Sequence, residues 1–303
     1  MERRVLVFGS TGQLARCLQR ADWPRDTVPV FLAREAADFS RPDGLPDIVR
    51  REKPQLMIIA AAHTDVDGAE SDEATAMIVN AAAPAAIARA AAELDAPVIF
   101  LSTDYVFDGR TEGAYAEGDA TNPINAYGRS KLTGEAALRA ANPRHLILRT
   151  SWLYSRYGKN FLRTMLRLAE TKAAVEVVDD QHGCPTSAHD LADAILRIVP
   201  RLFESEAPWG TYHLAGASVT TWHGFAEAIF SELAKRGKRR PNAQPVSSDA
   251  FERAARRPAN SRLSSELLAK TFGFRLPGFE TAMPRVLDEL MATRLRADEK
   301  AAG

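Results

Sequence analysis

The chain of 303 residues carries 39 basic and 39 acidic side chains, and 46% of its residues are hydrophobic. This composition excludes a disordered chain, and the balanced charge argues against nucleic acid or an anionic membrane as partner. Cys17 and Cys184 are too few for a disulfide framework and fit a reducing compartment. The apolar runs 5–8 and 56–62 are too short for a secretory signal or a membrane span, so we expect a cytoplasmic protein.

Short runs rich in Val, Ile, Leu and Phe alternate with Ala-rich helical segments in the first half of the chain. Continuous apolar strands are typical of a sheet covered on both faces, and the alternation predicts a Rossmann-type, doubly wound parallel sheet of the α/β class. The expected strands cover residues 5–8, 28–32, 56–61, 98–102 and 145–149, and the expected helices cover 13–20, 45–52, 80–94 and 126–141.

The second half of the chain loses this rhythm and predicts a smaller C-terminal α/β substrate lobe. We expect a dinucleotide-binding domain over residues 1–155 and a lobe mainly over 156–303, and a return of the chain to the first domain around 180–215 is left open. The expected helices cover residues 161–172, 188–202, 222–235 and 284–296, with short strands near Val175 and Tyr212.

The segment after the first strand has the composition of a phosphate-binding turn. The sequence Gly9-Ser10-Thr11-Gly12-Gln13-Leu14-Ala15 leads from strand to helix, where free backbone N–H groups meet a pyrophosphate and glycines let it approach. An ordinary strand-to-helix turn is the alternative. The expected cofactor-binding residues here are Gly9, Thr11, Gly12, Gln13 and Leu14.

The second strand ends near Arg34 and lacks the acidic residue that commonly binds the ribose of NAD. An arginine can hold the 2′-phosphate of NADPH, so NADPH is favoured, NADH stays open, and a plain surface role for Arg34 is the alternative. Small residues after the third strand leave room for a nucleotide, although His63 fits an ordinary loop as well. Further expected cofactor contacts are Asp38 and Phe39 at the adenine, then Ala62, His63, Thr64 and Leu101.

Tyr127 and Lys131 are four residues apart and therefore share one face of a predicted helix. An ammonium near the phenol is expected to lower the pKa of Tyr127 from about 10, which suits proton transfer near neutral pH. The fourth strand delivers Thr103 to the carboxyl edge of the sheet, where ligands bind. Thr103, Tyr127 and Lys131 are therefore the expected catalytic residues.

Together these motifs resemble the extended short-chain dehydrogenases/reductases, and more closely the dTDP-4-dehydrorhamnose reductase family. The resemblance spans nearly the whole chain. It implies NAD(P)H-dependent reduction of the C4 ketone of dTDP-4-dehydro-β-L-rhamnose to dTDP-L-rhamnose, the last step in making this sugar nucleotide for cell-surface polysaccharides. The blocks that carry it are Ala61-Ala62-His63-Thr64, Ser102-Thr103-Asp104-Tyr105-Val106-Phe107, Asn125-Ala126-Tyr127-Gly128, Arg149-Thr150-Ser151-Trp152, Gly183-Cys184-Pro185-Thr186 and Arg257-Pro258-Ala259-Asn260-Ser261.

The resemblance also implies roles for single residues. Tyr127 would protonate the C4 alkoxide, Lys131 would tune Tyr127 and hold the nicotinamide ribose, and Thr103 would hydrogen-bond the substrate carbonyl region. Asp104 and Trp152 would contact the sugar, although an aromatic residue after a buried strand is usually core. Arg257 is expected to clamp the diphosphate, since guanidinium binds phosphate in a bidentate manner, with a surface role as the alternative. These substrate-binding residues are Thr103, Asp104, Trp152 and Arg257.

Some similar proteins carry magnesium at a carboxylate-lined dimer interface, but the matching positions here lie near Cys17 and His189, which are not acidic. The six histidines lack metal-binding spacing, so we expect no metal, a nucleotide-sugar substrate and a monomer or homodimer. The alternatives are another nucleotide-sugar reductase or epimerase, or a non-catalytic NADP-binding regulatory subunit. A dehydratase is disfavoured because Tyr105 stands where elimination chemistry would place Glu.

Overall fold

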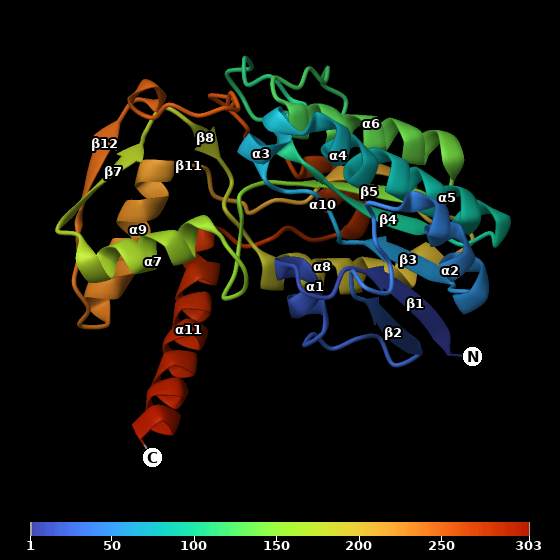
Figure 1. The fold of residues 1–303 in the computed structure, drawn as a ribbon, viewed down its shortest axis with the longest axis horizontal. Helices are drawn as coiled ribbons and strands as arrows, with labels where there is room; N and C mark the ends of the chain where they lie inside the picture. The colour runs from blue at the N-terminus through green and yellow to red at the C-terminus, as the bar shows by residue number, and fades with distance from the viewer. Residues whose placement is uncertain (1, 303) are drawn as a thin grey trace.

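The computed structural model describes the backbone of residues 2–302 and the side chains of residues 2–292, and its larger lobe is built on a six-stranded sheet (Figure 1). Every strand pair in this sheet is parallel, which confirms the predicted Rossmann-type α/β fold. The strand order is β10-β5-β4-β3-β1-β2, so the chain reverses direction across the sheet between β1 and β3. The strands are β1 Arg3–Phe8, β2 Thr27–Leu32, β3 Leu56–Ile59, β4 Val98–Thr103, β5 His145–Thr150 and β10 Gly210–His213.

Helices cover both faces of the sheet, as the continuous apolar strands require. Helices α1 (Gln13–Leu18) and α8 (Ala188–Ile198) pack on one face, and Leu268 of α10 (Glu266–Phe272) joins the same core. Helices α2 (Leu45–Glu52), α5 (Ala83–Glu93) and α6 (Ala126–Ala141) cover the opposite face (Figure 1). The strand near Tyr212, read from the sequence as isolated, is β10 at the edge of this sheet.

The helix predicted from residue 80 is the end of a longer helical segment. Helices α3 (Val66–Ser71) and α4 (Glu73–Met77) precede it, and a π-helical turn, Ile78–Ala82, joins α4 to α5. The stretch Glu73–Glu93 is long and apolar enough to cross a membrane by length and composition. However, 61% of its most apolar window is buried inside the protein, as in a core helix, so the stretch is weak evidence for a membrane span.

The smaller lobe has its own apolar core, formed where helices α7 (Phe161–Thr171), α9 (Trp222–Lys235) and α11 (Phe279–Ala302) pack together (Figure 1). Helix α11 begins at Phe279 and contains Pro284, so the sequence-based start at residue 284 was wrong. The elements of this half are β6 Leu153–Tyr154, α7 Phe161–Thr171, β7 Ala174–Val178, β8 His182–Gly183, β9 Thr186–Ser187, β11 Thr220–Thr221, α9 Trp222–Lys235, β12 Asn242–Val246 and α11 Phe279–Ala302. Short 3-10 turns cover Pro42–Gly44, Asp104–Val106, Val199–Phe203 and Ser248–Ala250.

Candidate active site

The predicted phosphate turn lies where the strand order reverses, between the carboxyl ends of β1 and β3. Gly9 has φ of 108°, and a Cβ atom there would lie 3.2 Å from the backbone nitrogen of Ala61, so glycine fits best. Thr11 and Gly12 are exposed, and a Cβ at Gly12 would meet nothing within 4 Å. The turn is therefore open to a ligand at the edge where such sheets bind nucleotides.

The residues expected near the adenosine end fall into two groups. The side chain of Arg34 is 79% exposed, and its Nε lies 3.5 Å from Asp38 Oδ1, so its guanidinium is available to an anion. Backbone and side-chain hydrogen bonds from Ser40 hold the pKa of Asp38 below its ordinary value. Phe39, by contrast, is only 5% exposed and packs on Phe8 in the core. Its ring therefore offers little surface to an adenine.

Asn80 is a site residue that the sequence analysis missed. It is 1% exposed within the π-helical turn, accepts a hydrogen bond from the backbone nitrogen of His63 (2.8 Å) and donates to the carbonyl of His63 (3.0 Å). It also donates to Ser130 Oγ of α6 at 2.9 Å. One amide thus ties the loop after β3 to the helix that carries Tyr127 and Lys131. The available signal was one polar residue within the otherwise apolar turn Ile78–Ala82.

Thr103, at the carboxyl end of β4, is tightly hydrogen-bonded to its neighbours. Its hydroxyl donates to Asp104 Oδ1 (3.0 Å) and accepts from the backbone nitrogen of Tyr105 (3.2 Å). Ser151 Oγ donates to Asp104 Oδ2 at 3.0 Å, and burial raises the pKa of Asp104 to about 6. Asp104 is 3% exposed, so its carboxylate lies behind Thr103 and faces protein groups.

Tyr127 opens helix α6 and is half-buried next to Tyr105, the ring centroids lying 6.1 Å apart. Gly128 permits this placement because a Cβ there would lie 2.1 Å from the carbonyl oxygen of Tyr105. Burial raises the pKa of Tyr127 well above its ordinary value, and hydrogen bonding with Thr103 opposes the rise only in part. The predicted lowering of the Tyr127 pKa by Lys131 is therefore wrong for the protein without its cofactor.

The physical reason lies in the position of Lys131. Its side chain is 2% exposed, its Nζ donates to the carbonyl oxygen of Leu101 at 2.6 Å, and it lies 4.0 Å from the ring centroid of Phe100. Burial lowers the pKa of Lys131 to about 7, and the charge of Glu135 opposes that shift. The ammonium is thus directed at the β4 backbone, and its positive charge is itself disfavoured.

Glu135 continues the helical face of Tyr127 and Lys131 by one more turn. Its carboxylate, 0% exposed, accepts hydrogen bonds from Arg149 Nε (2.9 Å) and Nη2 (2.8 Å), and from Ser102 Oγ (2.6 Å). Burial alone would raise its pKa, but these partners outweigh burial and hold the pKa low. His213 of β10 lies 3.5 Å from Arg149 Nη1, and burial beside this cation lowers the pKa of His213 to about 4.

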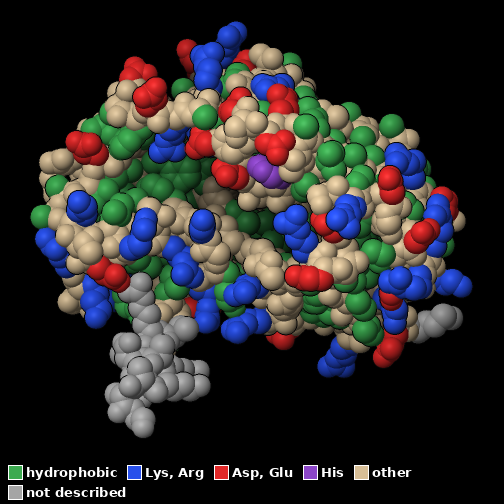
Figure 2. Space-filling model, viewed as in Figure 1, with side chains coloured by type: hydrophobic (Ala, Val, Ile, Leu, Met, Phe, Trp, Pro, Cys, Tyr) green, Lys and Arg blue, Asp and Glu red, His purple; other side chains and the backbone are tan. Residues whose placement is uncertain are grey.

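Trp152 lies at the junction of the two lobes in a strained conformation. Its φ is 47°, an unusual value for a bulky residue, and its indole stacks on Trp222 of α9 with centroids 3.5 Å apart and planes 4° apart. A Cβ at Gly183 would lie 2.3 Å from the Trp152 ring, so only glycine leaves room for it. Figure 2 shows that the molecule is hollowed between the two lobes, with hydrophobic side chains on part of the wall. Trp222 is a second residue that the sequence analysis missed.

Arg257 lies on the other side of the site, held by Asp67. Its Nη2 donates to Asp67 Oδ2 at 2.7 Å, its side chain is 12% exposed, and its guanidinium lies 5.9 Å from the Tyr105 ring centroid. Its Nε is buried without a protein hydrogen-bond partner. Arg257 is thus partly neutralised but retains an unused donor.

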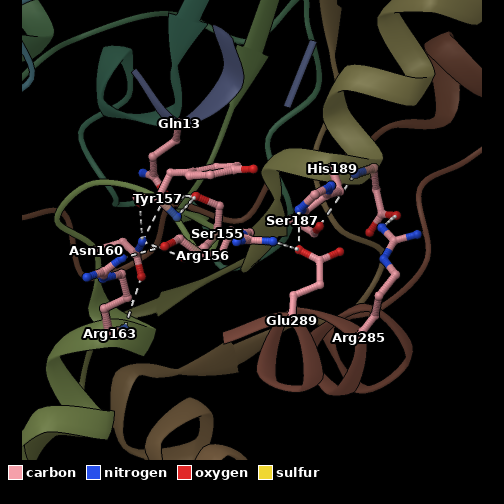
Figure 3. A network of polar contacts seen from close by, with 11 residues as sticks. Gln13, Ser155, Arg156, Tyr157, Asn160, Arg163, Ser187, His189, Arg285 and Glu289 are labelled. Atoms are coloured by element: carbon pink, nitrogen blue, oxygen red, sulfur yellow. Dashed lines mark hydrogen bonds and ion pairs between the residues drawn. The ribbon is translucent and has the colours of Figure 1, made fainter. Parts of the chain in front are cut away.

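Cys17 and His189, near which the sequence analysis expected no metal-binding carboxylates, line one cavity of about 290 Å³ together with two acidic residues, Asp193 and Glu289. His189 Nε2 lies 3.1 Å from Glu289 Oε2, a contact drawn in Figure 3. Within residues 2–292, no group of three or more His, Cys, Asp or Glu side chains is placed to hold a metal ion.

A Rossmann-type sheet with an open phosphate turn, a strand-end threonine and a Tyr-x-x-x-Lys helix defines a nicotinamide-nucleotide reductase of the short-chain dehydrogenase class. The chain belongs to the family described as "RmlD substrate binding domain", which matches residues 3–292.

The chain is also similar to named proteins over nearly the whole length of each. The chain is 43% identical over 290 residues to a dTDP-4-dehydrorhamnose reductase of Sinorhizobium fredii, covering 95% of this chain and 98% of the relative. It is 42% identical over 296 residues to the Salmonella typhimurium enzyme of the same name, with the same coverage. A crystal structure of the Bacillus anthracis enzyme in complex with NADP superposes with a TM-score of 0.89 at 33% identity, covering 95% of this chain and 100% of that one.

Proposed function

We propose that this protein reduces the C4 ketone of dTDP-4-dehydro-β-L-rhamnose with NADPH to give dTDP-L-rhamnose. The observation that carries the proposal is that Tyr127 hydrogen-bonds with Thr103 at the end of β4 and Lys131 donates to Leu101 of the same strand, in a chain 43% identical to a reductase of that name. NADPH, when bound, supplies the hydride that reaches C4. The protein supplies the proton that reaches the C4 oxygen.

Tyr127 is the proton donor in this account. A phenol with a raised pKa stays protonated at neutral pH, so it holds the proton until negative charge develops on the carbonyl oxygen. The hydroxyl of Thr103 donates to Asp104 in the protein without ligands, and it would turn from that carboxylate to donate a hydrogen bond to the substrate oxygen. Lys131, which donates to Leu101 at the strand edge, would hold the nicotinamide ribose and restore the proton-donating state of Tyr127.

The residues at the switch point of the sheet fit NADPH. Gly9 and the small side chains after β3 leave a cradle that a Cβ atom would narrow, and exposed Thr11 and Gly12 face the position of a pyrophosphate. The exposed guanidinium of Arg34 suits the 2′-phosphate. Gln13 and Leu14 would contribute backbone N–H groups, with Asp38, Ala62, His63, Thr64 and Leu101 lining the remainder.

The substrate side is formed by residues from both lobes. Trp152 would contact the sugar ring with the indole surface that Trp222 leaves free, and Arg257 would meet the diphosphate with the part of its guanidinium that is exposed, its side chain being 12% exposed. Tyr105 in place of an acidic residue favours reduction over water elimination. A monomer or homodimer in the cytoplasm, without nucleic acid or membrane, completes the proposal.

Replacement of Tyr127 by Phe tests the assigned chemistry. Loss of a general acid typically lowers turnover by about 10²–10⁴-fold, while the dissociation constant for NADPH should stay near the wild-type value. The matched control is Tyr212→Phe. Tyr212 lies in β10, and its hydroxyl donates to the carbonyl of Pro208 at 3.1 Å. Wild-type turnover by the Tyr127→Phe protein would refute the proton-donor role.

A further inference from the structure

The side chain of Gln13 turns away from the phosphate turn that its backbone helps to form. Gln13 is the first residue of α1 and follows Gly12, so its backbone N–H lacks an intrahelical acceptor. Its amide oxygen accepts hydrogen bonds from Ser155 Oγ (2.7 Å) and Asn160 Nδ2 (2.9 Å), and its nitrogen donates to the carbonyl of Leu153 (3.3 Å). Figure 3 shows Gln13 reaching from α1 toward Ser155 and Asn160 in the segment that leads into α7.

The loop between β6 and α7 is built around this one amide. Asn160 caps α7, because its Oδ1 accepts from the backbone nitrogen of Arg163 at 3.1 Å. Its Nδ2 also donates to the carbonyls of Ser155 (2.9 Å) and Tyr157 (3.0 Å). Ser155 is 0% exposed, and its hydroxyl also lies 3.2 Å from the carbonyl of Tyr157, so loss of the Gln13 oxygen would remove the link to α1 but keep the hydrogen bonds within the loop. The start of the smaller lobe is thus fixed to α1.

The same contacts reach the strained tryptophan. Leu153, whose carbonyl accepts from Gln13, directly follows Trp152, and a positive φ at a bulky residue persists only where its surroundings enforce it. Trp222 holds the Trp152 ring from the smaller lobe, and Gln13 holds the neighbouring backbone from the nucleotide side. The conformation of Trp152 therefore depends on both lobes.

We propose that Gln13 is a positioning residue that couples nucleotide-cofactor binding to sugar-nucleotide binding. Its backbone belongs to the phosphate turn and its side chain holds the segment from Trp152 to Asn160, so ordering of the turn also orders the sugar-facing side. Because linkage is reciprocal, a sugar nucleotide also tightens the binding of the cofactor. This inference rests on the proposed function, since it takes a pyrophosphate at the turn and a nucleotide diphosphate near Trp152.

Calorimetry of the full chain tests the coupling without any turnover. The dissociation constant for dTDP is measured with and without saturating NADP⁺. In the wild-type protein we expect NADP⁺ to tighten dTDP binding by at least about five-fold, the lower end of usual coupling. Gln13→Met keeps the side-chain length but removes all three hydrogen bonds, so the coupling should vanish while the dissociation constant for NADP⁺ alone stays near wild type.

Two further variants control for folding and for general disturbance of α1. Gln19→Met is the matched control, because Gln19 Nε2 donates to the carbonyl of Ser10 in the turn (3.1 Å) and makes no contact with the β6–α7 loop, so the coupling should persist. Ser155→Ala removes one donor to Gln13 and should reduce the coupling in part, which keeps the test available if thermal melting shows that Gln13→Met is unfolded.

Several results would overturn the inference. Coupling that persists in folded Gln13→Met, or that stays at the full wild-type value in Ser155→Ala where Gln13→Met is unfolded, would show that the Gln13 side chain does not transmit it. Weaker NADP⁺ binding in Gln13→Met, with dTDP affinity and the coupling both retained, would make Gln13 a cofactor-binding residue only. Wild-type protein that binds both ligands independently would overturn the inference alone, whereas binding of NADP⁺ without any binding of dTDP would overturn the proposed function as well.

Discussion

The buried carboxylate of Glu135 lies one helical turn beyond Lys131, and its removal should lower the free energy of unfolding. Glu135 and Arg149 have side chains 0% and 3% exposed, and they share two hydrogen bonds of 2.9 and 2.8 Å. Glu135→Gln preserves the side-chain shape but leaves the guanidinium of Arg149 buried without its counter-charge. Breaking one partner of a buried ion pair typically costs about 3–5 kcal/mol, and we expect a loss of that size in the free energy of unfolding.

The matched control is an exposed ion pair between α4 and α6. Glu73→Gln removes a carboxylate that also pairs in a bidentate manner with an α6 arginine, Arg129, at 2.9 and 2.9 Å, but both side chains are 41% exposed. Exposed pairs contribute at most about 1 kcal/mol, so this variant should lose far less. Urea unfolding with a common m-value gives both losses. Equal losses in the two variants would refute the reasoning from burial.

The same substitution should change the pH dependence of catalysis. Glu135 opposes the burial-driven lowering of the Lys131 pKa, so the ammonium loses support when the carboxylate becomes an amide. If catalysis requires charged Lys131, kcat/KM should fall at a lower pH in Glu135→Gln than in the wild type. If the fall of kcat/KM at alkaline pH is the same in Glu135→Gln and the wild type, Glu135 does not affect the function of Lys131 and has a purely structural role.

Three further predictions follow from the described contacts. Arg34→Ala should raise the KM for NADPH more than the KM for NADH, because only NADPH carries the 2′-phosphate; equal changes in steady-state assays would reject that contact. Trp222→Leu should raise the KM for the sugar nucleotide and weaken the near-ultraviolet circular dichroism of the stacked indoles. An unchanged KM would contradict the proposal that Trp152, held by Trp222, contacts the sugar. His213 has a folded pKa of about 4, below its ordinary 6.5, so the unfolded chain binds the extra proton and stability falls as pH drops from 6.5 to 4. His213→Gln should flatten that fall in urea titrations at stepped pH, and a parallel pair of curves would contradict this assignment.

The sequence predicts best what depends on local pattern. The apolar runs and their alternation with helical segments predict the parallel sheet, because strands buried on both faces leave a direct signature in the sequence. Both predicted ends of the helix at residues 126–141 are confirmed. Asn125 caps its N-terminus by accepting a hydrogen bond from the backbone nitrogen of Gly128 at 2.8 Å. Residue spacing along such a helix also places Tyr127 and Lys131 on a common face.

What the sequence could not show depends on contacts between distant segments. The pKa of Tyr127 is set by burial, which no local spacing reveals, and the amide of Gln13 meets partners about 140 residues away along the chain. Asn80 gains its role only when the π-helical turn meets α6. In the sequence, Trp222 is only the first residue of a predicted helix. It stacks on Trp152 only when the two lobes pack together.

The proposed reduction can be measured by supplying freshly generated dTDP-4-dehydro-β-L-rhamnose and following nicotinamide oxidation with NADPH and, in parallel, with NADH. We expect turnover with NADPH, a product with the mass and sugar stereochemistry of dTDP-L-rhamnose, and strong loss of this activity in Tyr127→Phe. Cofactor binding without any turnover of this substrate would contradict the proposed function.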